Sequence, residues 1–458
     1  MVIDFLGKRG DAACAPALLQ LAENGEPSVR IAAVKALTRL VHAPVVSLLA
    51  KLATAPETDL ADTARECLAS FPGKAADEAV LSVLASSDAA GRCFAAGLIA
   101  HRGHNIAVPA LMKAASSDPD ETVRLAALKE LRELAGMGEL DALLKILLES
   151  KSAPVIQATT HAIVSLCARQ QVVSGNVEIT KAIYGARDQS KIADVTKKAA
   201  ALVKKGSRSI EASNGNFGDP ANGIPKQLTI HYTVDGVQGR KTVPEGESVT
   251  LSSPSVSPAV VDPLLAAFAR ASGPAKIAVL RILQRAGGPK AFEGIRKAAS
   301  DGETGVRESA QQMLCDWPTP DALPAVRALA TNPSSANVKA PALRAWLRLV
   351  PLQAASDEEK LAQVKDALAL ASGKEEKKAA LAALQEIPLV AGLALVVPCL
   401  DNPDLTEEAC AAAVAIAGPI ASQHAAEVQA SMKKVSTLTK DKKLAGQAAK
   451  IARQTKAK

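Results

Sequence analysis

Residues 118–131 read DPDETVRLAALKEL, and this stretch decides the fold. An acidic, proline-containing turn is followed by Val-Arg, and an alanine comes three residues after the arginine. Leu125, Leu128 and Leu131 recur at the spacing that places side chains on one face of a helix. The same order of residue types returns at residues 26–33, and looser copies without the proline lie at 88–95 and 302–310. The stretch is therefore one copy of a repeated helical unit.

The repeat is about 31 residues long, because a basic residue recurs at that spacing. Arg92 and Arg124 are 32 residues apart, and Lys276 and Arg307 are 31 apart. This length leaves room for two helices and tight turns, so it predicts antiparallel helix pairs stacked side by side. We expect five such pairs before residue 170 and six more from about residue 258 to 457.

The acidic turn, the Val-Arg pair and the following alanine resemble the HEAT-repeat family in its PBS-lyase HEAT-like form. The resemblance covers most of the sequence and implies an α-solenoid. It also implies that Asp and Arg side chains form hydrogen-bond ladders between adjacent repeats. The arginines at this position, which the resemblance makes structural, are Arg30, Arg92, Arg124 and Arg307.

A second resemblance concerns the kind of organism and the cellular compartment of the protein. Residues 315–320, CDWPTP, followed by AWLRL at 345–349, resemble a repeat variant of large, often exported, multidomain bacterial proteins. This resemblance implies a bacterial protein and slightly favours an exported or periplasmic location over a cytoplasmic one. The start of the chain does not read as a signal peptide, because charged residues interrupt the first dozen positions. Ile3–Gly7 reads like the last turn of a helix, as expected if an upstream repeat or an export signal has been removed.

The period fails between residues 171 and 257, where Gly, Ser, Thr, Val and Asn become frequent. We expect strands at 177–184, 227–234 and 240–243, with Asp235-Gly236 as a hairpin turn, and a short strand at 248–251. Asp194 is the expected N-cap of a helix that runs to Val203. The predicted domains are therefore HEAT-like repeats at 1–170, an inserted α+β domain at 171–257, and HEAT-like repeats at 258–458.

Four segments of this insertion resemble the C-terminal domain of a mitochondrial DnaJ-type co-chaperone. They read AIYG at 182–185, ADVT at 193–196, FGDP at 217–220 and KQLTIHY at 226–232. No DnaJ helical module with a His-Pro-Asp tripeptide accompanies them. The resemblance therefore implies the domain fold and a general expectation of binding, and it does not imply chaperone stimulation.

Composition excludes several classes of function. Aromatic residues make up 2% of the chain, which argues against binding of bases or sugars by stacking. The net charge is +7, but residues 431–458 alone hold nine Lys or Arg and one Asp, so the rest is close to neutral. We interpret this basic end as a solvated last helix rather than a nucleic-acid site. The longest apolar run, residues 387–400, is too short to span a membrane and carries two prolines.

No catalytic, cofactor-binding or metal-binding motif is recognisable. The seven cysteines contain no C-x-x-C pair and are expected to be buried thiols, which weakly favours a reducing compartment. His101 and His104 lack a nearby carboxylate or cysteine, so we expect a solvated turn. Neither a Gly-rich phosphate loop nor a nucleophile elbow occurs. We therefore predict that the protein is not an enzyme and has no cofactor.

The function that the sequence favours is a non-catalytic scaffold whose curved helical surface binds protein partners. The inserted domain is the predicted source of specificity, because Asn and Asp residues gather beside a strand edge that could pair with an extended peptide. Two alternatives stay open. One is a carbohydrate- or envelope-associated module of an exported bacterial protein, and the other is a lyase-type enzyme subunit, since lyases acting on linear tetrapyrroles use HEAT-like repeats. The predicted partner-binding residues are Asn216, Phe217, Asp219, His231 and Tyr232. The partner, the oligomeric state and the compartment cannot be read from the sequence.

Overall fold

The computed structural model describes residues 2–42, 44–53, 58–86, 88–169, 176–186, 191–234, 237–251 and 258–455. Contacts divide the chain into two compact units. The first contains segments from both sides of the insertion, whereas the second contains most of the insertion and the C-terminal helices. Unit 1 comprises Met1–Gln171 with Val256–Ala286, and unit 2 comprises Val172–Ser255 with Gly287–Lys458. The three-domain division expected from the sequence stays a prediction.

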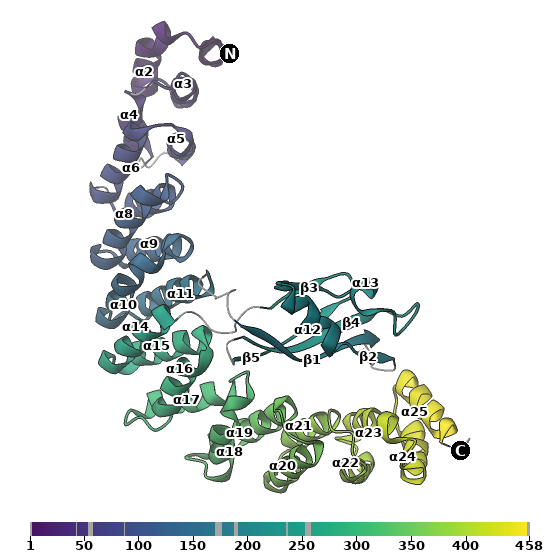
Figure 1. The fold of residues 1–458 in the computed structure, drawn as a ribbon. Coiled ribbons are helices and arrows are strands. Elements are labelled where there is room, and N and C mark those ends of the chain that lie inside the picture. The colour runs from purple at the N-terminus through teal and green to yellow at the C-terminus, as the bar shows by residue number, and fades with distance from the viewer. Residues whose placement is uncertain are drawn as a thin grey trace. The chain divides into compact units, whose positions relative to one another are not determined.

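Unit 1 is a stack of helices (Figure 1). From α2 onward, successive helices pack in pairs, and the second helices of neighbouring pairs also pack on each other, as α7 does on α9 and α9 on α11. These contacts match the five pairs expected before residue 170. The helices are α1 (Val2–Arg9), α2 (Ala15–Asn24), α3 (Pro27–Arg39), α4 (Val45–Leu52), α5 (Thr58–Ser70), α6 (Lys74–Ser86), α7 (Ala89–Ile99), α8 (His104–Ser117), α9 (Glu121–Leu134), α10 (Leu140–Glu149), α11 (Ala153–Arg169), α14 (Pro258–Arg270) and α15 (Gly273–Ala286).

The helical stack continues across the inserted domain. Although about ninety residues separate α11 from α14 in the sequence, α11 packs against α15 and α10 packs against α14. These are the same neighbour relations that join α9 to α11 earlier in the stack. The insertion therefore interrupts the chain between two helix pairs without interrupting their packing.

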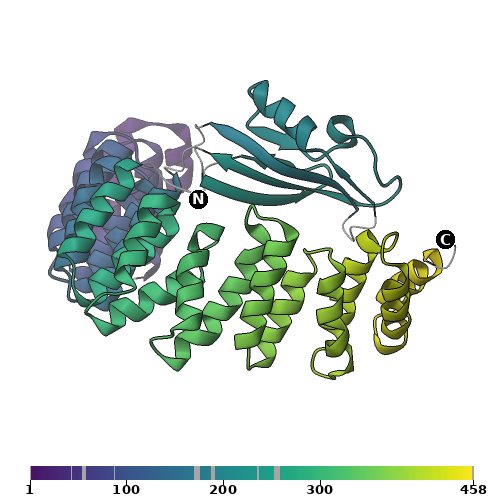
Figure 2. The same ribbon diagram turned by 60° about the horizontal axis from the view of Figure 1, so that its bottom comes forward.

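The helices of unit 2 also lie in a row of pairs (Figure 2). The second helices of successive pairs pack in the order α17, α19, α21, α23 and α25. With α14–α15, these pairs match the six expected after the insertion. They are α16 (Gly288–Ala298), α17 (Thr304–Cys315), α18 (Leu323–Thr331), α19 (Ala336–Leu349), α20 (Asp357–Leu370), α21 (Lys374–Leu384), α22 (Val390–Val396), α23 (Thr406–Ile420), α24 (Ala425–Leu438) and α25 (Lys442–Gln454).

The repeated alanine explains how the helices come close enough to stack. Its four copies, Ala33, Ala95, Ala127 and Ala310, are all fully buried. A small side chain at this position lets the backbone of the neighbouring helix approach, whereas a leucine would hold it away. In α9, Asp120 accepts a hydrogen bond from the Thr122 amide at the helix start. Asp120, in the acidic turn that the sequence shows before this helix, is therefore its N-cap.

The inserted domain is a small α+β unit. Its four-stranded antiparallel sheet has the order β2-β1-β4-β5, and β3 pairs separately with β6. The predicted β4–β5 hairpin is present, while its turn at 235–236 lies outside the described residues. The elements are β1 (Val177–Ala186), β2 (Ile192–Asp194), α12 (Thr196–Lys204), β3 (Ser209–Glu211), α13 (Asn214–Phe217), β4 (Lys226–Val234), β5 (Val237–Pro244) and β6 (Ser248–Thr250).

One face of this sheet carries the core of the inserted domain. Burial alternates along β4, with Leu228, Ile230, Tyr232 and Val234 buried and the residues between them partly exposed. The buried face packs with residues of α12, such as Ala199. The alternation of apolar and polar residues that predicted β4 therefore also indicates which of its side chains face outward.

The basic end of the chain forms α25, which has a buried apolar side and an exposed basic side. Ala448 is buried, whereas Lys442, Lys443, Lys450 and Arg453 are exposed. The last three residues lie outside the described part. Within the described residues, we find no helix with the length and hydrophobicity needed to cross a membrane.

Candidate functional site

The four repeat arginines hold turns and neighbouring pairs together. Arg92 of α7 forms a bidentate ion pair with Asp118, which follows α8 in the next pair. Arg124 and Arg307 instead donate to the Asp118 and Asp301 carbonyl oxygens, each at the end of the first helix of its own pair. Arg30 likewise donates to the Ala22 carbonyl oxygen at 3.1 Å. Of these contacts, the Arg92–Asp118 pair is the rung between repeats that the family resemblance implies.

A second set of arginines joins neighbouring pairs, and the sequence analysis missed it. Arg102, Arg169 and Arg348 lie at or just beyond the ends of second helices and donate to carbonyl oxygens at the end of the preceding second helix. The distances are 2.6 Å to Phe71, 2.6 Å to Ala135 and 2.7 Å to Trp317. These contacts satisfy carbonyls that a helix end leaves without a partner. In the sequence, the only indication of this role was that each arginine lies at or near the end of a predicted helix.

Two of the five predicted partner-binding residues belong to the core of the inserted domain. Phe217 and Tyr232 are each 2% exposed. The Phe217 ring lies 5.4 Å from the ring of Tyr184, and Tyr232 is paired with Gly239 on β5. These two side chains stabilise the domain and do not face solvent. They are therefore not part of a surface that a partner can contact.

Asn216 and Asp219 hold the loop that precedes β4. The Asn216 side-chain amide donates to the Glu211 carbonyl oxygen at 2.9 Å, and Asp219 accepts from the Ala221 amide. Asp219 also forms an ion pair with Lys226 at 3.2 Å. The cluster of Asn and Asp therefore makes capping and turn contacts, and its binding of a partner stays a prediction.

Lys226, which the sequence analysis did not single out, organises a buried polar cluster. Its side chain is 4% exposed, and its ammonium lies 3.2 Å from both the Asp219 and the Glu245 carboxylates. Burial lowers the pKa of Lys226, but its hydrogen bonds to the two carboxylates outweigh this effect and raise the pKa above its ordinary value. Burial, with Glu245 nearby, also raises the pKa of the Tyr184 hydroxyl. Lys226 is therefore a charged structural link between the loop and β4.

His231 lies on the outer face of β4, half-buried and away from the core. Burial lowers the pKa of His231 to about 4, with further lowering from Arg240, Lys181 and Lys360 of α20. Positive neighbours disfavour the protonated ring, so His231 is neutral at pH 7. Of the five predicted residues, His231 has the most distinctive electrostatic surroundings.

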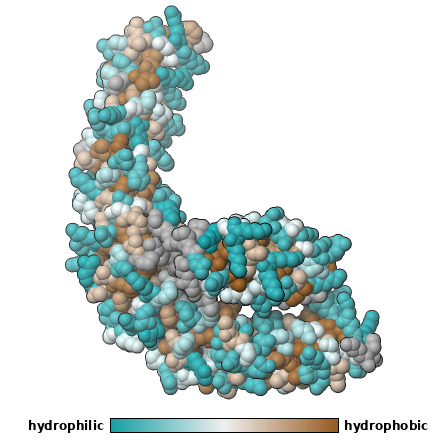
Figure 3. Space-filling view, in the orientation of Figure 1, coloured by the Kyte–Doolittle hydropathy of each residue, from teal (hydrophilic) through white to brown (hydrophobic). Residues whose placement is uncertain are grey.

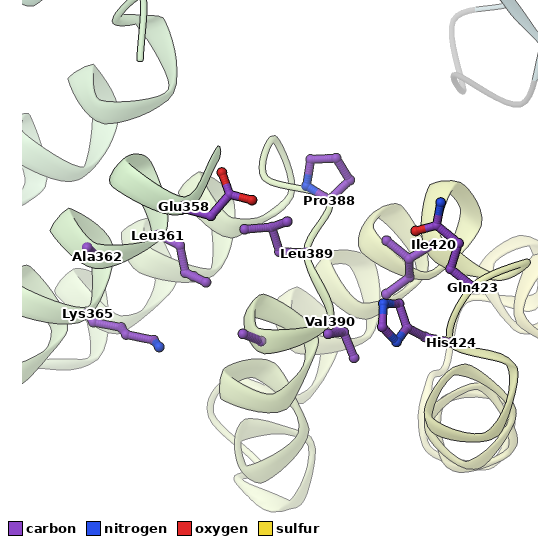
Figure 4. Close-up of a pocket in the computed structure, with 11 residues that line it drawn as sticks. Glu358, Leu361, Ala362, Lys365, Pro388, Leu389, Val390, Ile420, Gln423 and His424 are labelled. Carbon is purple, nitrogen blue, oxygen red and sulfur yellow. The ribbon is translucent and has the colours of Figure 1, made fainter. Parts of the chain in front are cut away.

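A groove crosses three neighbouring pairs of unit 2 (Figure 4). It has a volume of about 430 Å³ and is lined by α20, the segment leading into α22, and the end of α23. Leu361, Leu389 and Ile420 supply apolar surface, with Glu358 and His424 among its polar residues. The groove was not predicted from the sequence, because its walls come from three successive repeats and depend on how those repeats pack.

Burial raises the pKa of the four buried cysteines, Cys67, Cys167, Cys315 and Cys410. All seven cysteines are free, and four of them are buried. Burial raises the pKa of Cys167 to about 12 and that of Cys315 and Cys410 to about 11, so these groups are thiols at neutral pH. Among the residues that the structure describes, no three His, Cys, Asp or Glu side chains gather as a metal site would require.

Comparison with known proteins identifies the repeats. The family model of HEAT repeats matches residues 1–69 and 78–164. No curated protein sequence matches the chain significantly.

Solved structures give further matches, of which three illustrate the range. The structure of Kap95p with RanGDP has 14% identity and a TM-score of 0.47, and the match covers 97% of this chain and 55% of that one. A Kap121p mutant has 10% identity and a TM-score of 0.48, with 97% and 49% covered. Human deoxyhypusine hydroxylase has 15% identity and a TM-score of 0.23, with 83% and 98% covered. The chain spans about half the length of the first two chains. It is a mainly α protein, an α-solenoid with HEAT repeats that is interrupted by a small α+β domain.

Proposed function

We propose that this protein is a non-catalytic scaffold that binds protein partners through its helical repeats and through the inserted domain. The observation that carries this proposal is the packing of α11 on α15, and of α10 on α14, across the insertion. A domain that the stack does not need for its own continuity has a separate role. Stacked repeats offer the long surfaces on which proteins of this architecture bind partners.

The chemistry of the described residues supports a binding role over a catalytic one. The buried thiols have raised pKa values, which disfavours a cysteine nucleophile of the kind that a lyase subunit would use. The buried Lys226 is held by two carboxylates, so its ammonium is not poised to lose a proton. Both features stabilise the fold instead of preparing a reaction.

The surface favours proteins over sugars. Trp317 and Trp346 are 2% and 0% exposed, so neither ring is available to stack on a sugar. Among the large hydrophobic residues exposed in the described part, Phe5 is the aromatic one. On the face shown in Figure 3, hydrophobic residues lie in small areas among hydrophilic ones. The described surface therefore favours a protein partner over the carbohydrate-binding alternative.

The experiment that tests the scaffold function compares two baits in native lysate and envelope fractions. One is the full chain, and the other has residues 171–257 replaced by a short Gly/Ser linker. Bound proteins are identified by mass spectrometry and then tested one at a time in purified form. A protein bound by the full chain and not by the shortened chain supports recognition by the inserted domain. If no purified candidate binds either bait, the scaffold function is wrong.

A further inference from the structure

A row of three basic side chains crosses the outer face of the inserted sheet. The strand register pairs Lys181 of β1 with His231 of β4, and His231 with Arg240 of β5. Directly paired residues on antiparallel strands carry their side chains on the same face, with Cβ atoms roughly 5 Å apart. Because Ile230 and Tyr232 point into the core, the row stands on the opposite face. Lys181 and Arg240 are exposed.

The row lacks a carboxylate partner in the described part of the chain. No ion pair there joins an acidic residue to Lys181, His231 or Arg240. Two acids of the sheet lie near the row without an ion pair to it. Glu178 pairs with Thr233, one row away. Asp194 accepts from the Thr196 amide, and Lys181 acts on its carboxylate only through space, as a minor cause of its lowered pKa. The third cation that acts on His231, Lys360, lies 3.9 Å from Asp357 of its own helix. Lys181 and Arg240 thus place two positive charges beside the neutral His231 ring, and a negative group from outside would offset them.

The row ends at an edge strand. β5 is the last strand in the order β2-β1-β4-β5, so its far side has no partner in that sheet. An extended peptide that adds to β5 continues the ladder and places every second side chain on the outer face. The side chain nearest the row then lies beside Arg240. The strand edge supplies main-chain hydrogen bonds, and the row selects the charge.

We propose that the β5 edge and the outer face of the sheet bind an acidic, extended segment of a protein partner. Lys181, His231 and Arg240 form its carboxylate-binding row. This inference rests on the scaffold function proposed above and names the chemistry of the partner. The Arg240 guanidinium and the Lys181 ammonium donate to the partner's carboxylates. His231 gains a proton more easily once those carboxylates offset its positive neighbours.

The test uses the full chain and two synthetic peptides of equal length. In one, glutamate alternates with threonine, and in the other, glutamine replaces every glutamate. Fluorescence anisotropy measures binding at low salt and at 0.15 M salt, where screening weakens exposed charge pairs. In parallel, histidine-labelled NMR follows the pKa of His231, which the His231→Gln variant assigns. We expect the glutamate peptide to bind more tightly and to move the pKa of His231 from about 4 towards 6.5.

Two double variants of the inserted domain provide a matched comparison. Lys181→Gln with Arg240→Gln removes two charges from the row and should weaken binding of the glutamate peptide about tenfold. Lys204→Gln with Lys205→Gln removes two charges from exposed positions at the end of α12 and should leave binding unchanged. All four residues are exposed, so circular dichroism should show the same fold for both proteins.

Several results would overturn the proposal. They are equal binding of the two peptides, full binding by the Lys181/Arg240 variant, or the same loss in the Lys204/Lys205 variant. Inorganic phosphate is the third probe. If phosphate alone raises the pKa of His231 as far as the glutamate peptide does, the row is a small-anion site and not a docking site. Failure here leaves partner capture by the full chain intact, whereas failure of the scaffold function is read from partner capture itself.

Discussion

Arg92 and Asp118 join two neighbouring helix pairs through a bidentate ion pair. The Arg92 Nε atom lies 2.8 Å from Asp118 Oδ2, and its Nη2 atom lies 3.0 Å from Oδ1. The Asp118 carboxylate also accepts from the Asp120 amide, and its main-chain carbonyl accepts from Arg124. One aspartate therefore links the preceding pair, the turn and the following helix.

Replacement of Arg92 should cost less stability than replacement of Asp118. Arg92→Gln removes the rung, whereas Asp118→Ala removes both the rung and the acceptor of the Asp120 amide. In a double-mutant cycle, the two losses should add to more than the loss in the double variant, because both single changes break the same ion pair. Urea unfolding followed by circular dichroism measures the three values. Strict additivity would show that the rung contributes nothing.

Gly239→Ala should destabilise the inserted domain. A Cβ atom at Gly239 would lie 2.7 Å from the Tyr232 ring, which is buried and has little room to move. Overpacking of this kind costs about 1–3 kcal/mol. Both tyrosines of the chain, Tyr184 and Tyr232, lie in this domain's core, so second-derivative absorbance of tyrosine follows its unfolding. Gly215→Ala, where the nearest atom would be 3.7 Å away, is the matched control and should have a smaller effect.

Trp346 should tolerate phenylalanine far better than alanine. Its side chain is fully buried, and its indole N–H has no hydrogen-bond partner. Trp346→Phe keeps most of the ring and loses no hydrogen bond, so we expect a cost of about 1 kcal/mol. Trp346→Ala leaves a cavity and should cost about 3–5 kcal/mol. In both variants Trp317 is the remaining tryptophan, and its fluorescence during urea unfolding gives the two values. Equal costs would contradict the packing described here.

Acid should weaken the inserted domain through His231. The pKa of His231 is about 4 in the folded state and about 6.5 when unfolded, so the unfolded state binds the proton first as the pH falls. The stabilising contribution is complete above pH 6.5 and is lost between pH 6.5 and 4. The full shift corresponds to about 3 kcal/mol, which exposure of the ring reduces to about 1–2 kcal/mol. His231→Gln should flatten this part of the pH profile, measured by tyrosine absorbance. An unchanged profile would refute the assignment.

Removal of residues 171–257 should leave the helical stack folded. Because α11 packs on α15 and α10 on α14, a short Gly/Ser linker can join α11 to α14. We expect the helical melting midpoint of the shortened chain to stay within about 2 °C of that of the full chain, as measured by circular dichroism. Aggregation or loss of a cooperative transition would show that the stack depends on the inserted domain.

Local sequence patterns were sufficient for the helix pairs and for the longer strands. The apolar face of residues 123–131, the buried repeat alanine and the alternation along β4 are all properties of neighbouring residues. The short elements β2, β3 and α13 were missed, although β6, which is equally short, was predicted at 248–251. The predicted N-cap of α12, Asp194, was wrong by one residue: Val195 is the N-cap, and Asp194 accepts from the Thr196 amide. Phe217 and Tyr232 were assigned to a surface although they lie in a core, because an aromatic residue near a loop reads the same in either place.

The sequence by itself determined the fold class and the period of the repeats, because these depend on the spacing of apolar residues along the chain. The tertiary structure alone decided that Arg92 reaches Asp118, that α11 meets α15, and that Lys181, His231 and Arg240 stand in one row. Each of these relations joins residues that are distant in the chain, and helix packing or strand register sets their separation. The pattern of residues that are adjacent in the sequence carries no information about that separation.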